Sequence, residues 1–140
     1  IGNSHGLNKF EGKPELKFDI LQEINKNIPG VPLVLHGASS LPEKYVSIIS
    51  EYGGTLKKVT GVPMDQIIKA TKLGIKKINI YTDLTLCMMA SVRRYLFNNP
   101  AEIDPRKYLG SCRDEISGLV SEKMQQFGLV NRTAGLAAKK

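Results

Sequence analysis

The 140-residue chain has no tryptophan, two histidines, two cysteines and an aromatic content of only 6%. Two cysteines are too few for a disulfide framework, and Cys87 and Cys112 fall in helical patterns, so we expect reduced thiols. No stretch approaches the roughly 18 consecutive apolar residues that a membrane span requires, and no signal-peptide pattern is present. The sequence therefore predicts a soluble, cytoplasmic protein that does not bind membranes.

The net charge of +7 raises the possibility of a nucleic-acid partner. However, the lysines and arginines are scattered and adjoin one another only in pairs, and no aromatic residues are interleaved with them as a stacking platform would require. We therefore expect no nucleic-acid binding. Binding of anionic, phosphate-bearing substrates explains the positive net charge better than nucleic-acid binding does.

The hydrophobic periodicity alternates between strand and helix signals. Three strands are expected: one ending near His5, one over 31–35 and one over 76–81. Helices are expected over 18–27, from 41–42 to 53–54, from 63 to 74, over 82–98 and over 107–127. Residues 1–128 are then expected to belong to a single domain, and residues 129–140 to form a C-terminal tail. This alternation is typical of a parallel α/β fold, either a small sheet or the closing part of a (β/α)8 barrel.

Both histidines stand in the same context, because His5 and His36 each follow apolar or small residues and precede a glycine. They are about thirty residues apart, which is roughly one strand–helix–strand unit. Parallel strands bring their equivalent ends to one face, so the two imidazoles are expected to converge. Either histidine alone would be read as an ordinary strand-end residue. Together they resemble an incomplete catalytic zinc site, which usually has three protein ligands.

Four motifs, in order, carry a resemblance to a known family: Ile-Gly-Asn-Ser-His-Gly at 1–6, Pro-Leu-Val-Leu-His-Gly-Ala-Ser at 32–39, Lys-Ile-Asn-Ile-Tyr-Thr-Asp at 77–83 and Asp-Pro-Arg-Lys-Tyr-Leu at 104–109. They resemble the C-terminal half of the class II, zinc-dependent ketose-bisphosphate aldolases, which include fructose- and tagatose-bisphosphate aldolases. The resemblance covers nearly the whole chain except its last ten or so residues. It implies a TIM barrel, of which these would be the sixth to eighth strands and their helices.

The resemblance also implies roles for individual residues. His5 and His36 match the family's second and third zinc ligands, and Asn79 matches the residue that hydrogen-bonds the bound triose at the catalytic centre. The residues matched to phosphate or substrate binding are Gly6, Gly37, Ser39, Asn79, Tyr81, Thr82, Asp83 and Arg106. Glycine lets backbone N–H groups approach an anion closely, and a helix N-terminus attracts anions. Thr82 and Asp83 can also be interpreted as a plain N-cap, and the two interpretations are compatible.

The implied activity is reversible cleavage of fructose 1,6-bisphosphate to dihydroxyacetone phosphate and an aldehyde phosphate, with Zn²⁺ as cofactor; a monovalent cation is a further candidate. The first zinc histidine and the general acid/base aspartate belong to earlier strands, so the chain would act only with the remainder of its own barrel. A homodimer or homotetramer is implied. An inactive aldolase fragment serving as an interaction module is the competing interpretation, because open strand edges attract partners.

Two departures from the fructose-bisphosphate pattern concern the substrate. Tyr81 stands where many of those enzymes have an acidic or small polar residue, and Thr85 stands where they have an arginine that helps to bind the far phosphate. A threonine cannot supply the bidentate grip of a guanidinium. Tagatose 1,6-bisphosphate or another ketose phosphate is therefore the rival substrate. Arg106 either reaches a neighbouring subunit's site or is an exposed residue at a helix start.

Overall fold

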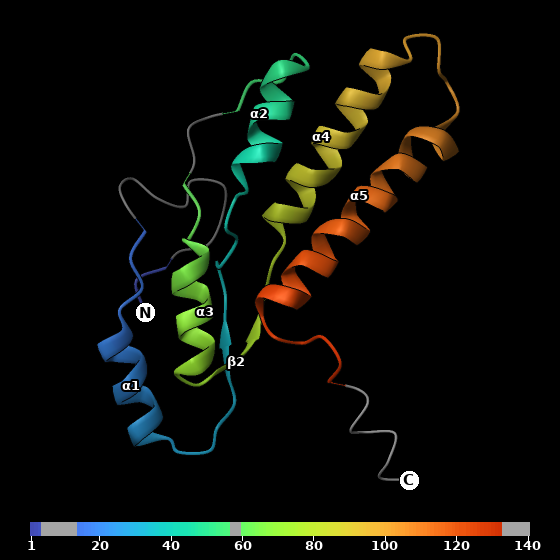
Figure 1. Cartoon of the computed structure of the whole chain (residues 1–140). Coiled ribbons are helices and arrows are strands. Elements are labelled where there is room, and N and C mark those ends of the chain that lie inside the picture. Colours follow the sequence, from blue (N-terminus) through green and yellow to red (C-terminus); the bar gives the residue numbers. More distant parts are fainter. Residues whose placement is uncertain (4–13, 57–59, 133–140) are drawn as a thin grey trace, which may run out of the picture.

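The computed structural model describes residues 1–3, 14–56 and 60–132. Its elements, in chain order, are α1 (Phe18–Asn27), β1 (Leu33–Leu35), α2 (Glu43–Glu51), α3 (Met64–Lys72), β2 (Ile75–Ile78), α4 (Thr82–Asn98) and α5 (Pro105–Gln126). Figure 1 shows two regions that lie end to end. We call α1, β1, α3 and β2 the sheet region, and α2, α4 and α5 the helical arm.

The two strands pair in parallel, with Leu33 opposite Ile75 and Leu35 opposite Ile78. Parallel neighbours need a crossover connection, which α2 and α3 supply here. The described residues thus contain two of the three expected strands. Ile1 to Asn3 are not in a strand, and the rest of the expected first strand lies outside the described residues. The mixed α/β class is confirmed.

Both strands are shorter than the sequence pattern predicts. The first begins at Leu33 and not at residue 31, because Pro32 has no N–H group to give to a ladder. The second covers 75–78 and not 76–81, so the chain leaves the sheet before Ile80. The backbone N–H of Asn79 still donates to the Leu35 carbonyl at 3.0 Å, which extends the strand pairing by one bond.

Helices α1 and α4 have the bounds that periodicity predicts, whereas α5 begins at Pro105 and not at residue 107. The Asp104 side chain accepts a hydrogen bond from the Arg106 N–H, and Pro105 occupies the first turn. Proline is favoured there because its missing N–H would have no helical partner. Pro105 therefore starts the helix two residues earlier than the apolar periodicity predicts.

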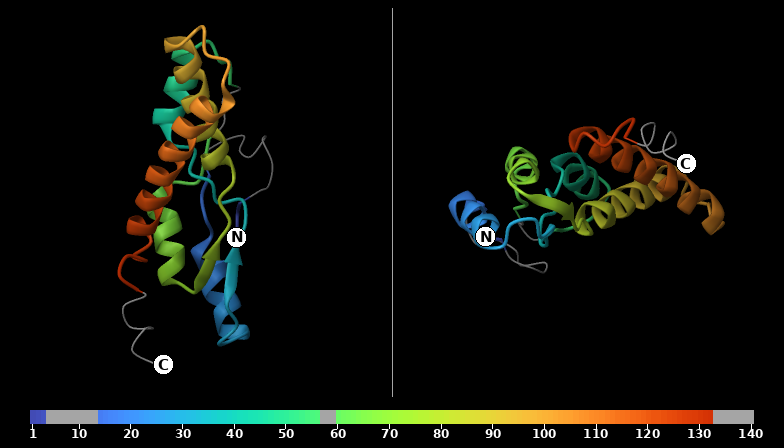
Figure 2. Two further views of the ribbon diagram at one scale, coloured as in Figure 1. Left: turned by 90° about the vertical axis from the view of Figure 1, so that its right-hand side faces the viewer. Right: turned by 90° about the horizontal axis from the view of Figure 1, so that it is seen from below.

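Each region has its own apolar core. In the sheet region the buried residues are Leu16, Leu21, Leu35, Ala38, Val62, Ile67, Ala70 and Ile75. In the helical arm they are Leu41, Tyr45, Ile49, Leu86, Cys87, Ala90 and Leu119. The two further views agree that α4 and α5 run alongside each other away from the strands (Figure 2). No helix in the described part of the chain is both long and apolar enough to cross a membrane.

Candidate functional site at the strand ends

Polar residues follow the ends of both strands and contact one another. The side-chain amide nitrogen of Asn79 lies 3.1 Å from Nδ1 of His36. The His36 side chain is exposed, and its backbone carbonyl accepts a hydrogen bond from the side chain of Asn3. A polar residue between two isoleucines requires a partner, and for Asn79 that partner is His36. The contact fixes the position of the imidazole at the carboxyl end of the sheet.

The expected convergence of the two histidines stays a prediction. His5 and Gly6 lie outside the described residues, although Asn3, two positions earlier in the sequence, contacts the carbonyl of His36. Across the described ranges no three His, Cys, Asp or Glu side chains form a group that could hold a metal ion. His36 is a suitable zinc donor, being an exposed imidazole held through one ring nitrogen. A catalytic zinc site would need further protein ligands beside it.

A buried loop leads from β1 to α2, beginning at Gly37 with a positive φ of 61°. Glycine adopts this left-handed conformation without the steric cost of a Cβ. Ser39 is only 1% exposed. Its hydroxyl accepts a hydrogen bond from the Thr82 N–H at 3.3 Å, and its carbonyl accepts one from the Val62 N–H at 3.1 Å. The loop is therefore bonded directly to the N-terminus of α4.

Asp83, in the first turn of α4, is fully buried and points back toward the same loop. Its carboxylate accepts hydrogen bonds from the N–H and hydroxyl of Ser40, at 3.2 and 2.7 Å, and from the N–H of Leu41 at 2.8 Å. The Lys123 ammonium completes the set at 3.0 Å. The N-cap interpretation was wrong, because Tyr81 occupies the cap position of α4 and no side chain caps it. The geometry favours loop anchoring over substrate contact for Asp83.

Sequence reasoning missed Lys123, Ser40 and Leu41 in this cluster. Lys123 is only 8% exposed, which is rare for a lysine unless its charge is paired. One signal was available, because Lys123 follows Leu119 by four positions and so lies on the same face of α5. Leu119 itself belongs to the core of the helical arm. The sequence around Ser40 and Leu41 contains no spacing pattern that would have predicted their contacts with Asp83.

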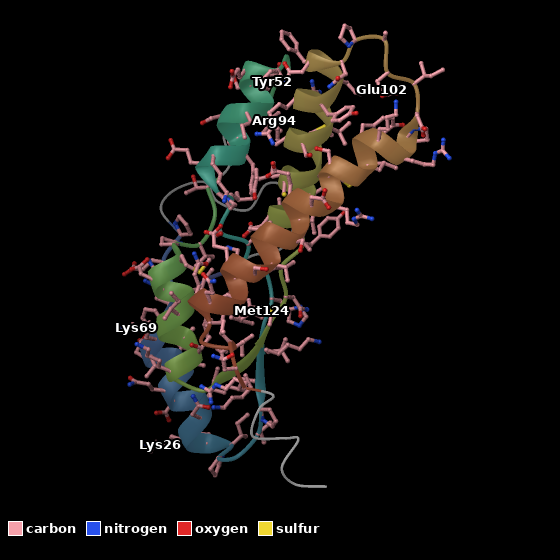
Figure 3. The ribbon with its side chains drawn as sticks, turned by 45° about the vertical axis from the view of Figure 1, so that its right-hand side comes forward. Lys26, Tyr52, Lys69, Arg94, Glu102 and Met124 are labelled. Carbon is pink, nitrogen blue, oxygen red and sulfur yellow. The ribbon has the colours of Figure 1, made fainter. Side chains whose placement is uncertain are left out.

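The remaining predicted residues lie at the surface. Tyr81 is 76% exposed just after β2, and the Thr85 hydroxyl donates to its carbonyl at 3.0 Å. Arg106 is exposed and pairs with Asp104 at 2.7 Å. Figure 3 shows Glu102 in the connection between α4 and α5, at the opposite end of the arm from Met124 near the strands. Within this chain, Arg106 is thus not brought to the cluster around His36.

The described residues thus form a parallel α/β arrangement in which His36 and Asn79 meet where the two strands end. Ligand sites in α/β folds are built at this edge of the sheet. Residues 1–132 match the family model described as "Fructose-bisphosphate aldolase class-II". The chain therefore belongs to the class II fructose-bisphosphate aldolase family, as the four motifs indicated.

Curated relatives of the chain are named fructose-bisphosphate aldolases. It is 46% identical over 138 residues to a fructose-bisphosphate aldolase of Treponema pallidum, covering 90% of this chain and 42% of the relative. It is 41% identical over 142 aligned positions to one of Pseudomonas aeruginosa, covering 99% and 39%. It is 45% identical over 132 residues to one of Thermus caldophilus, covering 94% and 43%. The chain thus spans about two-fifths of the length of these relatives.

Proposed function

We propose that this chain supplies the sixth to eighth strands of a class II aldolase (β/α)8 barrel, acting with the remainder of that barrel. The proposed reaction is reversible cleavage of fructose 1,6-bisphosphate to dihydroxyacetone phosphate and an aldehyde phosphate in carbohydrate metabolism. Family membership and the His36–Asn79 contact at the strand ends support this proposal. The contact carries most weight, because its imidazole and amide follow the ends of parallel strands, and (β/α)8 barrels bind ligands at the carboxyl ends of their strands.

His36 would bind the zinc ion together with His5 and a ligand from the remainder of the barrel. When bound, zinc polarises the ketose oxygens and stabilises the negative charge that develops as the carbon–carbon bond breaks. Asn79 orients the His36 ring through Nδ1 and also offers an amide to the hydroxyl groups of the triose. The general acid/base carboxylate, which the family places on an earlier strand, moves the proton at the aldehyde oxygen.

The phosphate of the triose would bind between the loop that follows β1 and the start of α4. Gly37 has no side chain to keep an anion from its backbone N–H, and the N-terminal N–H groups of α4 would contribute to the same site. The Thr82 N–H contacts the Ser39 hydroxyl and thereby joins the two segments. Gly6 would contribute a second backbone N–H group. An assembly of two or four copies, in which Arg106 reaches a neighbouring site, belongs to the same proposal.

Tagatose 1,6-bisphosphate is the second candidate substrate, and one observation favours it. Tyr81 is 76% exposed between β2 and α4, and Thr85 donates its hydroxyl to the Tyr81 carbonyl. A tyrosine ring at this edge changes the space available to the aldehyde half of the sugar. The two sugars differ in configuration at one carbon of that half. Their relative turnover therefore tests the role of Tyr81.

The test uses the complete protein that contains this chain, loaded with zinc. Cleavage of both ketose bisphosphates is followed by the triose phosphate released, and bound zinc is measured separately. We expect turnover of fructose 1,6-bisphosphate, and loss of both zinc and turnover in His36→Ala. Lys26→Ala, at the exposed end of α1 (Figure 3), is the matched control and should retain both. Zinc-dependent turnover that survives His36→Ala would exclude the assigned ligand.

A further inference from the structure

A buried charged cluster joins two helices of the arm, α4 and α5, to the loop that follows β1. Lys123 comes from α5, and its ammonium lies 3.0 Å from Asp83 Oδ2 and donates to the Ser40 hydroxyl at 2.8 Å. Asp83 comes from the first turn of α4 and has no exposed surface. Ser40 lies in the loop, three residues before α2 begins. Three segments far apart in the sequence therefore meet at one ion pair.

The carboxylate of Asp83 is fully occupied by this cluster. Its Oδ2 faces the N–H and hydroxyl of Ser40 and the ammonium of Lys123, and its Oδ1 accepts from the Leu41 N–H at 2.8 Å. Leu41 has a positive φ of 52°, which is unusual for a residue with a Cβ. Such a conformation persists only where the surroundings hold it in place. The hydrogen bond from Leu41 to Asp83 provides that constraint.

The segment held by the cluster is continuous with the candidate phosphate site. Ser39, next to Ser40, accepts a hydrogen bond from the Thr82 N–H, and Thr82 adjoins Asp83. Gly37 and His36 precede Ser39 in the same loop. A shift of the Ser40 backbone would therefore move the N–H groups of the loop relative to those of α4. Anion binding by backbone N–H groups depends on the relative placement of these groups.

We infer that Lys123 is a positioning residue for the phosphate site: it acts through Asp83 and Ser40 to hold the loop 37–41 against the N-terminus of α4. This inference rests on the proposed function, because the phosphate belongs to the proposed substrate. Lys123 does not touch the substrate in this assignment. Its removal is expected to weaken binding of the sugar phosphate and to change the chemical step much less.

A second ion pair in the arm provides a matched control for removing the positive charge of Lys123. Lys44 on α2 pairs with Glu122 on α5 at 3.0 Å, one residue before Lys123 in sequence. Both partners of this pair are about half exposed, whereas those of the Asp83–Lys123 pair are 0% and 11% exposed. Lys44→Met therefore deletes the same charge from the same helical arm without touching the loop.

The experiment compares Lys123→Met, Lys123→Arg and Lys44→Met in the complete zinc-loaded protein. The readouts are kcat and KM for fructose 1,6-bisphosphate, the Kd for inorganic phosphate by calorimetry, and the thermal midpoint. For Lys123→Met we expect KM and the phosphate Kd to rise about tenfold, with kcat changed less than about threefold. Lys123→Arg should recover most of this loss, because it keeps the charge, and Lys44→Met should resemble the unaltered protein.

Each result decides the inference. An unchanged KM and phosphate Kd in folded Lys123→Met would overturn it, and so would an equal loss in Lys44→Met. If Lys123→Met does not fold, Ser40→Ala, which removes one hydroxyl and keeps the ion pair, takes its place. A phosphate Kd unaltered in Ser40→Ala would then overturn the inference. If the unaltered protein binds phosphate but cleaves neither sugar, the proposed function fails, and the phosphate Kd values still decide the role of Lys123.

Discussion

The sheet region and the helical arm bury different kinds of side chain. All the core residues of the sheet region are aliphatic, from Leu16 to Ile75. The arm also buries Cys87 and Cys112, the Tyr45 side chain and the Asp83–Lys123 pair. Burial raises the pKa of Tyr45, and a hydrogen bond with Cys87 raises it further. Aliphatic packing stabilises the folded state but does not fix how the side chains are oriented. Buried polar contacts do fix it, because a hydrogen bond requires a definite geometry.

The polar contacts are concentrated where the two regions meet. Asn79 and His36 lie on the sheet side of this boundary, and Asp83 and Lys123 lie on the arm side. The loop 37–41 passes between them. The His36–Asn79 part of the candidate site thus comes from the sheet region, and residues of the arm hold the adjoining loop in position. The following predictions test this division of roles.

The largest expected effect is loss of aliphatic packing in the sheet region. Ile67 on α3 has no exposed surface, so Ile67→Ala should lower the free energy of unfolding by about 2–5 kcal/mol. Amide hydrogen exchange should accelerate most in α1, α3 and the strands. Ile20→Ala, at a position 47% exposed on α1, should change stability by less than about 0.5 kcal/mol. Equal acceleration throughout the arm would show that the two regions open as one unit.

A smaller effect is expected at the boundary itself. A Cβ on Gly61 would lie 2.3 Å from the Ser40 carbonyl carbon and 2.7 Å from the Ser39 carbonyl oxygen. These are backbone atoms of the held loop, so Gly61→Ala should cost about 1–3 kcal/mol through overpacking. Gly53→Ala gives a comparison, since no atom lies within 4 Å there, although its φ of 77° adds strain. Phosphate affinity should fall in Gly61→Ala and stay unchanged in Gly53→Ala.

Thiol labelling reports on the arm alone, because both cysteines lie there. Burial raises the pKa of Cys87 and of Cys112, so little thiolate is present at neutral pH. We expect alkylation of the native protein to be about a hundredfold or more slower than in urea, since the thiolate is the reactive form. Ile67→Ala should leave this rate nearly unchanged. Rapid labelling of the unaltered protein would contradict the close packing of α4 on α5.

The smallest effect concerns the far end of the arm. A hydrogen bond with Lys107 lowers the pKa of Glu102, and one with Arg106 lowers the pKa of Asp104. Their pairing therefore contributes fully above the ordinary carboxyl pKa range and is lost as the pH falls through the lowered values. Amide exchange at the start of α5 should rise over that acid interval, while exchange in α3 should not. The contribution of these ion pairs is measured by the pH dependence of amide hydrogen exchange at residues 105–108, with residues 67–70 of α3 as the comparison.

Much of the local structure followed from residue pattern. The apolar spacing in 18–27 and 82–98 predicted both helices with their observed bounds, and alternation of strands and helices predicted the parallel pair. The ends of the strands were less predictable, because they depend on which backbone groups find hydrogen-bond partners. The first strand starts only after Pro32, and the second ends at Ile78 although the apolar pattern continues. The motifs around His36 and Asn79 identified the family, which the match over residues 1–132 confirms.

The sequence by itself determined the class of fold, the family and the identity of the residues at the strand ends, because periodicity and motif order are local properties of the chain. Only the tertiary structure decided which of these residues meet. It paired His36 with Asn79, and it turned Asp83 inward to Ser40 and Lys123, which stands forty positions further along the chain. Burial of a charge requires partners on all sides, and these partners come from segments that only packing brings together.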